Sequence, residues 1–236
     1  MAEPSEGAVL GSLLSWTGAR CPERRTLEGR RVRLVPLDAA HHAPGLFHCS
    51  HGSKEDALWT YLSVGPFGSP EAMNRWLEQM SASQDPLFLT VIGSDDEPAG
   101  MVSFMRIDPP MGVIEIGNIW FAPLLQRTTA ATEVIFLMID YVFTELGYRR
   151  LEWKCNALNT PSRRAADRFG FTFEGVFRQH QVVKGRNRDT AWYALVDHEW
   201  PRLRGCFERW LADDNFDEQG YQKSSLRSLI AASLEP

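Results

Sequence analysis

The stretch NALNTPSRRAADRFGFTFEGVFR, residues 156–178, decides how the rest of the chain is interpreted. Asn159 is a residue type that caps helices, and Gly170 is a residue type that ends them. Hydrophobic period and turn residues together indicate alternating strands and helices in this half of the chain. The elements predicted here are a strand over 150–155, a helix over 161–169, and strands over 171–177 and 190–196.

A strand, a tight turn and a long helix precede this stretch. Residues 113–121 are typical of a strand, and the apolar period then changes to that of a helix over 129–146. A turn that feeds a helix N-terminus presents backbone N–H groups without partners inside the helix, which suits a phosphate or diphosphate. Arg127 adds a positive charge to this turn, and Thr128 and Thr129 add hydroxyl donors.

The first hundred residues predict further parts of the same domain. Asp38 is placed to cap one helix, and the run Ser69-Pro70-Glu71 is a strong start for another. Additional strands are predicted over 31–35, 86–92 and 101–107.

We divide the chain into three parts. They are an N-terminal arm over 1–26, one folded domain over 27–200, and a C-terminal helix with an acidic tail over 201–236. The arm carries a short apolar patch between Val9 and Trp16 that is suited to dock on the domain. Beyond Asp213 the tail is polar, a composition typical of mobile segments.

The charge of the chain argues against two common kinds of partner. The 236 residues include 25 Lys and Arg and 30 Asp and Glu, a formal net charge of -5. Proteins that coat nucleic acid or anionic membranes carry strong positive charge, so we expect neither partner. No apolar run is long enough to span a bilayer, and the acidic start over 1–7 lacks the basic residues of a secretory signal. Four scattered cysteines without a Cys-x-x-Cys pair favour a cytoplasmic location with free thiols.

The order of these features resembles one known family. The pattern N-x-x-S-x-x-x-x-x-[KR]-x-G-F-x-x-E-G follows a P-x-x-Q-R turn and a helix. It is similar to the GCN5-related N-acetyltransferase (GNAT) superfamily, and most to the branch that acetylates protein N-termini, including those of ribosomal proteins. The resemblance implies an α/β fold: a twisted, mixed, mostly antiparallel sheet with helices on both faces. Two central parallel strands, here 113–121 and 150–155, would splay apart.

The resemblance also implies acetyl-coenzyme A as co-substrate, lying in the gap between the splayed strands. The diphosphate would sit on the N–H groups of residues 126–131, and the pantetheine arm would pair with residues 119–121 and with Asn159. The implied coenzyme-binding residues are Ile119, Trp120, Phe121, Gln126, Arg127, Thr128, Thr129, Ala130, Ala131, Asn159 and Ser162.

Two positions depart from the family pattern. Thr129 stands where the first glycine of the phosphate turn is common, and glycine there lets a backbone approach a phosphate closely. Threonine keeps its backbone N–H, so the turn still offers donors. Ala166 stands where many members place a tyrosine that protonates the leaving thiolate. By analogy with the N-terminal acetylating branch, Ser162 would take this role.

Glu115 is the residue we predict as general base. It lies on a strand that lines the gap, and a carboxylate near an apolar cleft has a raised pKa. Strand N–H groups near residues 119–121 would hold the developing oxyanion. We expect direct acetyl transfer to a primary amine, either a protein N-terminus or a small molecule, without a metal. The acceptor pocket would be built by the helices between Asp38 and Met80 and by a hairpin over 178–188.

Each of these roles has a structural alternative. In these alternatives, Glu115 would only pair with an arginine on the sheet surface. Ser162 would only satisfy backbone groups in the first turn of a helix, and Asn159 would only cap that helix. The run His48-Cys49-Ser50-His51 has too few nearby ligands for a metal site. For the whole chain, the alternative is a catalytically weak acyl-coenzyme A-binding regulatory module. A homodimer through an edge strand or the terminal helix is also left open.

Overall fold

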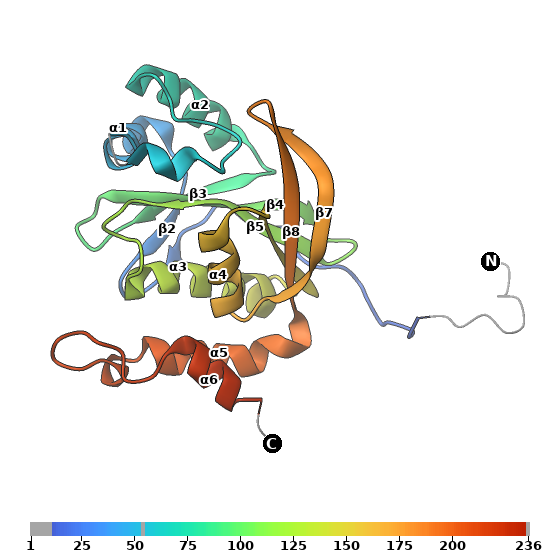
Figure 1. Cartoon of the computed structure of the whole chain (residues 1–236). Helices are drawn as coiled ribbons and strands as arrows, with labels where there is room; N and C mark the ends of the chain where they lie inside the picture. Colours follow the sequence, from blue (N-terminus) through green and yellow to red (C-terminus); the bar gives the residue numbers. More distant parts are fainter. Residues whose placement is uncertain (1–10, 53–54, 235–236) are drawn as a thin grey trace, which may run out of the picture.

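One eight-stranded sheet with helices on both faces forms the protein in the computed structural model, which describes residues 11–52 and 55–234 (Figure 1). The strands lie in the order β1-β2-β3-β4-β5-β6-β8-β7. All neighbouring pairs are antiparallel except β5 and β6, which are parallel. The predicted fold class is confirmed. The strands are β1 (Leu27–Glu28), β2 (Arg33–Pro36), β3 (Leu87–Ile92), β4 (Pro98–Asp108), β5 (Val113–Phe121), β6 (Arg150–Asn156), β7 (Thr172–Val183) and β8 (Arg186–Val196).

The helices form two unequal layers. Helices α1 and α2 cover one face of the sheet, α3 and α4 cover the other, and α5 and α6 lie beyond α3 and α4 (Figure 1). The longer helices are α1 (Ala39–Ser50), α2 (Pro70–Ala82), α3 (Thr129–Asp140), α4 (Thr160–Arg168), α5 (Trp200–Leu211) and α6 (Leu226–Ala232). The short turns are η1 (Glu55–Trp59), η2 (Tyr141–Glu145), η3 (Asp197–Glu199) and η4 (Asp213–Asn215).

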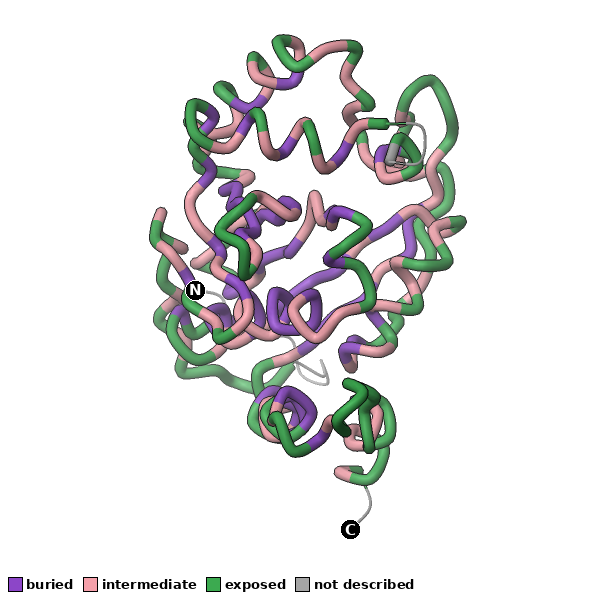
Figure 2. Tube along the Cα trace, turned by 90° about the vertical axis from the view of Figure 1, so that its left-hand side faces the viewer, coloured by how far each residue is buried: buried purple, intermediate pink, exposed green. Residues whose placement is uncertain are grey.

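The sheet divides the interior into two apolar clusters, and the buried parts of the chain run through the middle of the molecule (Figure 2). The larger cluster joins the sheet to α3 and α5 through residues such as Ile116, Val134 and Phe207. The smaller one joins it to α1 and α2 through Leu46 and Leu77. Because each face is covered, both central strands are largely buried where they pair.

Local sequence signals account for most helix ends. Asp38 caps α1 by accepting from Ala40 N–H at 3.0 Å, and Ser69 caps α2 by accepting from Ala72 N–H at 3.2 Å. Both predicted caps are confirmed. The helix predicted over 129–146 is present as α3 followed directly by the π-helical turn η2, so the helical chain is continuous and only its last turn changes hydrogen-bond pattern.

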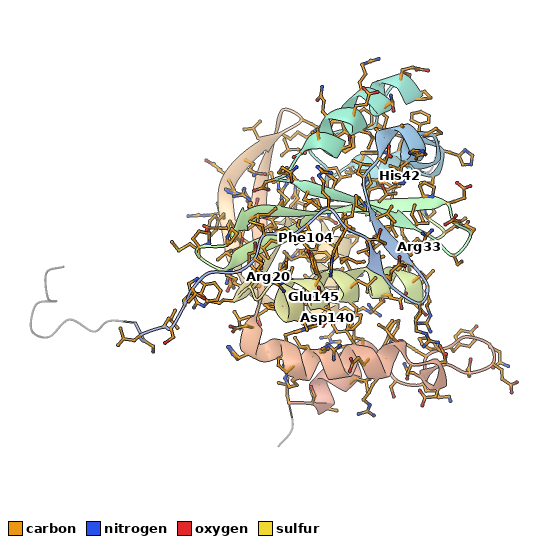
Figure 3. The ribbon with its side chains drawn as sticks, turned by 180° about the vertical axis from the view of Figure 1, so that it is seen from behind. Arg20, Arg33, His42, Phe104, Asp140 and Glu145 are labelled. Carbon is orange, nitrogen blue, oxygen red and sulfur yellow. The ribbon has the colours of Figure 1, made fainter. Side chains whose placement is uncertain are left out.

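Helix α3 is tied to α5 by polar as well as apolar contacts. Asp140 Oδ1 accepts from Arg204 Nε at 2.9 Å and from Trp200 Nε1 at 3.2 Å, and Asp140 is labelled above α5 in Figure 3. These bonds fix the helix that carries the C-terminal segment against the main domain.

The N-terminal arm runs along the domain without forming a helix in residues 11–26. Trp16 Nε1 donates to the Pro110 carbonyl at 2.6 Å, and Arg20 donates to the Glu145 carbonyl (Figure 3). Leu13 and Leu14 are exposed. Of these three residues of the predicted patch, only Trp16 docks on the domain. Residues 9 and 10 of the patch lie outside the described residues.

The C-terminal tail differs from the mobile segment that its composition predicts. Residues after α5 form η4, an isolated bridge between Phe216 and Gln222, and α6. Leu226 is fully buried against the larger apolar cluster. A few apolar side chains suffice to anchor a polar segment when they reach a core that the rest of the chain has formed. The composition of the tail cannot indicate such an anchor, because the core lies in other parts of the sequence.

None of the described helices has the length and hydropathy that crossing a membrane requires.

We predict that Leu226→Ala lowers the free energy of unfolding by about 2–4 kcal/mol, because it leaves a cavity where a fully buried side chain was. For a chain of this size that is a fall in Tm of about 4–16 °C. Thermal unfolding followed by circular dichroism measures it, with the exposed Leu234→Ala as control. Equal Tm values for the two variants would contradict the packing of α6.

Candidate active site

The gap between β5 and β6 begins where their parallel pairing ends. The register runs from Val113 opposite Arg150 to Ile116 opposite Trp153, and it includes no later pair although both strands continue. From Gly117 on, the edge of β5 that faces β6 has no strand partner. The splayed central strands that the resemblance implies are therefore present.

A bulge in β5 turns the free edge toward the gap. Ser103 on β4 pairs with Gly117 while Met101 pairs with Trp120, so β5 holds one extra residue between these pairs. Asn118 has a φ of 51°, and its Nδ2 donates to Ser103 Oγ at 2.9 Å. A bulge re-aims the backbone that follows it, which here is residues 119–121.

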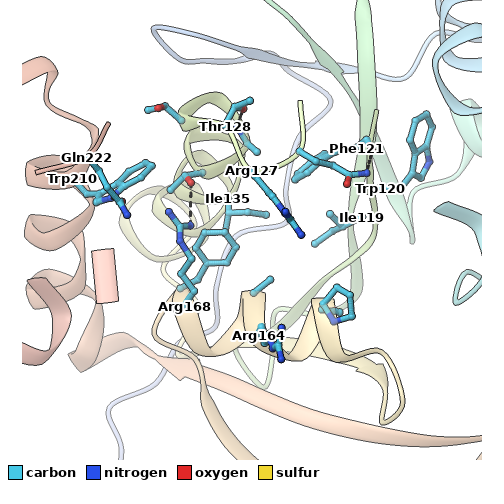
Figure 4. Close-up of a pocket in the computed structure, with 18 of the residues that line it drawn as sticks. Ile119, Trp120, Phe121, Arg127, Thr128, Ile135, Arg164, Arg168, Trp210 and Gln222 are labelled. Atoms are coloured by element: carbon cyan, nitrogen blue, oxygen red, sulfur yellow. Dashed lines mark hydrogen bonds between the residues drawn. The ribbon is translucent and has the colours of Figure 1, made fainter. Parts of the chain in front are cut away.

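A cleft of about 1020 Å³ fills this gap and extends past the start of α3 (Figure 4). It is lined by every residue predicted to bind the coenzyme except Ala130: Ile119, Trp120, Phe121, Gln126, Arg127, Thr128, Thr129, Ala131, Asn159 and Ser162. The structure thus brings together residues from β5, the β5–α3 turn and α4. Glu115 is not among the lining residues.

Only part of the phosphate turn has free N–H donors. Gln126 N–H donates to the Ala122 carbonyl at 3.2 Å, Thr128 N–H to the Leu125 carbonyl, and Ala131 N–H to Thr128 Oγ1 at 3.1 Å. Among the described residues this leaves the N–H groups of residues 127, 129 and 130 without a hydrogen-bond partner. The first turn of α3 carries no acidic residue, so an anion there meets no repulsion from it.

Arginines supply the positive charge of the cleft. Arg127, Arg164 and Arg168 all line it, and within the described part of the chain none of them forms an ion pair with a carboxylate. Arg127 has a φ of 62°, in the left-handed region that favours glycine. A charged residue is held there at a backbone cost, beside a helix N-terminus.

The first turn of α4 forms the opposite wall. Asn159 Oδ1 accepts from Ser162 N–H at 3.2 Å, so the predicted cap is present, and its Nδ2 has no protein partner in the described chain. Ser162 Oγ accepts from Trp153 Nε1 at 3.0 Å and lies within hydrogen-bonding reach of the Cys155 thiol. Both residues therefore cap or support α4 and still face the cleft.

Glu115 lies in a buried charge network beside the cleft. Its Oε2 is 2.9 Å from Lys154 Nζ and 3.2 Å from Arg106 Nε, and its side chain is 7% exposed. Lys154 also pairs with Glu152 and lies 3.9 Å from the centre of the Trp192 ring. Burial raises the pKa of Glu115, and the positive charges of Lys154 and Arg106 oppose that rise. The arginine pairing considered from the sequence is present, together with a lysine that it did not indicate.

The run His48-Cys49-Ser50-His51 and the buried Cys155 carry no chemistry of their own in the structure. His51 Nε2 accepts from Phe67 N–H at 2.9 Å, and its ring stacks on Phe47. No group of three or more metal-ligating side chains gathers in the described ranges. Burial raises the pKa of the Cys155 thiol, which disfavours the thiolate that a covalent acyl intermediate would need.

Sequence reasoning missed one end of the cleft. Arg168 lines it, and so do Trp210 from α5 and residues 216 and 220–222 from the tail. The spacing of Arg164 and Arg168, four residues apart on one helix, was an available signal for Arg168. No local signal connects the tail to this cleft, because more than 80 residues separate it from the phosphate turn.

Comparison with known proteins identifies the family. A model described as "Acetyltransferase (GNAT) domain" matches residues 31–172. The chain belongs to the GNAT family. A GCN5-related N-acetyltransferase from Brucella melitensis has a solved structure that is 50% identical, with a TM-score of 0.90, covering 93% of this chain and 100% of that one.

Relatives with curated names agree with this assignment. The uncharacterized N-acetyltransferase p20 of Bacillus licheniformis is 28% identical over 75% of this chain and 96% of its own length. The putative ribosomal N-acetyltransferase YdaF of Bacillus subtilis is 31% identical over 45% of this chain and 57% of its own. Ribosomal-protein acetyltransferases are thus among the relatives, as the sequence resemblance predicts. The chain is an acetyltransferase that uses acetyl-coenzyme A.

The residues of the cleft fit this coenzyme. Free N–H groups at the start of α3 and unpaired arginines suit its diphosphate, and the free edge of β5 suits the amides of its pantetheine arm. In a solved structure, RimL, a ribosomal L7/L12 alpha-N-protein acetyltransferase, is in complex with coenzyme A; it is 22% identical, with a TM-score of 0.61, over 73% of this chain and 99% of that one. At that identity the likeness concerns the fold alone.

We predict that Arg127→Gly weakens coenzyme A binding about fivefold to tenfold while the free energy of unfolding changes by less than about 1 kcal/mol. The substitution removes the positive charge of the guanidinium, but glycine adopts the positive φ of this position without strain. Isothermal titration calorimetry and thermal unfolding measure the two effects.

The control for that variant is Asp96→Gly, which changes another residue of positive φ, in the β3–β4 turn away from the cleft. It should leave coenzyme A affinity unchanged. Unchanged affinity in Arg127→Gly as well would show that Arg127 contributes nothing to the anion site.

Proposed function

We propose that the protein transfers the acetyl group of acetyl-coenzyme A directly to a primary amine, and that this amine is the N-terminus of a protein. The observation that carries the proposal is the free edge of β5 beyond the Ile116–Trp153 pair, which opens into a cleft with an anion site at its middle. The relatives named as ribosomal-protein acetyltransferases favour a protein N-terminus over a small amine.

The acceptor would approach from the face that carries α1 and α2. There the tip of the β7–β8 hairpin meets the segment after α1: Lys184 Nζ donates to the Trp59 carbonyl at 2.7 Å. Tyr61 Oη donates to the Leu158 carbonyl at 3.1 Å, which connects that segment to the start of α4. Leu58, from the same segment, lines the cleft near Ile119 and Trp120. These contacts favour an acceptor entrance bordered by the hairpin tip, residues 58–61 and the start of α4.

Each residue has a definite part in the proposed reaction. The coenzyme supplies an activated acetyl thioester, and the protein positions it and moves protons. N–H groups of residues 119–121 stabilise negative charge on the acetyl oxygen. Glu115, which does not reach the cleft surface, receives the proton of the amine through water. Ser162 Oγ relays the second proton of the acceptor nitrogen: its hydroxyl gives a hydrogen to the leaving thiolate and takes up the proton that the nitrogen loses as the amide forms.

We predict that Glu115→Gln lowers kcat/KM by about 10²- to 10⁴-fold, because the amide cannot accept the proton. In the unchanged protein, kcat/KM should rise with pH through a pKa above the ordinary glutamate value, since burial raises the pKa of Glu115 and only its ionised form accepts a proton. The variant should lose this acidic limb of the pH profile.

Glu97→Gln, in the exposed β3–β4 turn, is the matched control. An unaltered rate and an unaltered pH profile in Glu115→Gln would assign Glu115 to the sheet's charge network only.

We predict that Ser162→Ala lowers kcat about tenfold to a hundredfold while the Kd for coenzyme A changes less than about threefold. The reason is that alanine removes the proton donor and leaves the α4 backbone cap on Asn159 intact. Steady-state kinetics and calorimetry separate the two quantities, and Ser162→Thr, which keeps a hydroxyl, should retain most activity. A normal kcat in the alanine variant would reject the proton-donor role.

Free-thiol release from acetyl-coenzyme A, measured with N-terminal peptides and with small amines, tests the acceptor. Release with peptides, with the acetyl group found on the α-amine by mass spectrometry, is the expected result. Release with small amines alone would reject a protein N-terminus. Tight coenzyme binding without release on any acceptor would favour the regulatory module instead.

A further inference from the structure

One end of the cleft is lined by residues that lie outside the matched GNAT region of residues 31–172. Trp210 at the end of α5 and residues 216 and 220–222 line the same cleft as the phosphate turn. In Figure 4, Arg127 lies between Ile119 on one side and Arg168 with Trp210 on the other. The cleft is thus longer than the stretch from the β5 edge to the start of α3.

This end of the cleft is a built part of the fold. Trp210 Nε1 donates to Gln222 Oε1 at 2.8 Å, and the Trp210 ring meets the edge of Phe216 at 5.4 Å between centroids. Asn215 is buried, and its Nδ2 donates to the carbonyls of Trp210 and Ser224, both at 3.1 Å. These bonds hold residues 215–222 in one conformation beside α5. We call residues 213–222 the C-terminal wall.

Arg168 joins this wall to α3. Its guanidinium donates to Thr132 Oγ1 at 3.1 Å and lies between two rings, 4.8 Å from the Trp210 centroid and 5.1 Å from that of Phe169. Burial lowers the pKa of Arg168. No carboxylate of the described chain pairs with it, so a partly buried cation faces the cleft with donors to spare.

The chemistry of the coenzyme assigns an occupant to this end. With the thioester near residues 119–121 and the diphosphate on the start of α3, the part of the molecule that remains is adenosine with a phosphate monoester on its 3′ oxygen. A phosphate dianion is the ligand that an unpaired arginine binds best, and an aromatic wall suits a base. Arg164, one helical turn before Arg168, lines the same side.

We infer that Arg168 and the C-terminal wall form the site for the adenosine 3′-phosphate of the coenzyme. The chain then distinguishes coenzyme A from its 3′-dephospho form, with Arg168 pairing the phosphate and Tyr221, which is 73% exposed at the edge of the cleft, covering the adenine. The inference rests on the assignment of coenzyme A as ligand and not on the identity of the acceptor.

Calorimetric titration with coenzyme A and with 3′-dephospho-coenzyme A tests it without any acceptor. The unchanged protein should bind coenzyme A about tenfold to a hundredfold more tightly than the dephospho form. Arg168→Gln should weaken coenzyme A binding by that factor, leave dephospho-coenzyme A binding within about twofold, and so abolish the preference. Equal weakening of both ligands, or of neither, would overturn the role of Arg168.

Two further variants keep the test decisive if Arg168→Gln folds poorly. Tyr221→Ala changes an exposed side chain and should weaken both ligands alike, by about tenfold. Unchanged affinity in that variant would remove Tyr221 and the adenine contact from the site. Arg209→Gln is the matched control, since Arg209 is exposed on α5 next to Trp210 and does not line the cleft; it should bind both ligands as the unchanged protein does.

Discussion

The end of the parallel pairing between β5 and β6, after Ile116 and Trp153, is the constraint on which the rest of the site depends. Backbone groups on a strand edge must find partners, and β5 carries a bulge at Asn118 just where its pairing with β6 has ended. Helix α3 starts at the mouth of the same gap. Donors for an extended amide chain and donors for a diphosphate are therefore aligned along one ligand path.

Charge is distributed differently on the two sides of this gap. Glu115 and Glu152 share Lys154, and each also pairs with an arginine, Arg106 and Arg150 respectively, which makes the burial of these carboxylates tolerable. Arg127, Arg164 and Arg168 have no such partners in the described chain. The fold thus leaves arginines unpaired where we propose that the anionic coenzyme lies, and it pairs Lys154 and Arg106 where proton transfer is proposed, although the net charge of the chain is -5.

The C-terminal segment shows how a tail becomes part of a site. Leu226 anchors α6 in the larger apolar cluster, and Asn215 and Trp210 fix the intervening residues beside α5. Helix α5 is in turn held to α3 through Asp140. The helix that begins at the anion site therefore also positions the wall that closes the far end of the cleft.

The sequence by itself determined the elements whose signals are local. The bounds of β5, the caps Asp38 and Ser69, and the cap Asn159 follow from residues within a few positions, and the family pattern over 159–175 indicated the coenzyme cleft. Tertiary structure alone decided that Lys154 neutralises Glu115, which free N–H groups the turn offers, and that the tail reaches Arg168. These depend on contacts between segments that are distant in the chain, and composition cannot specify them because they exist only after the core has formed.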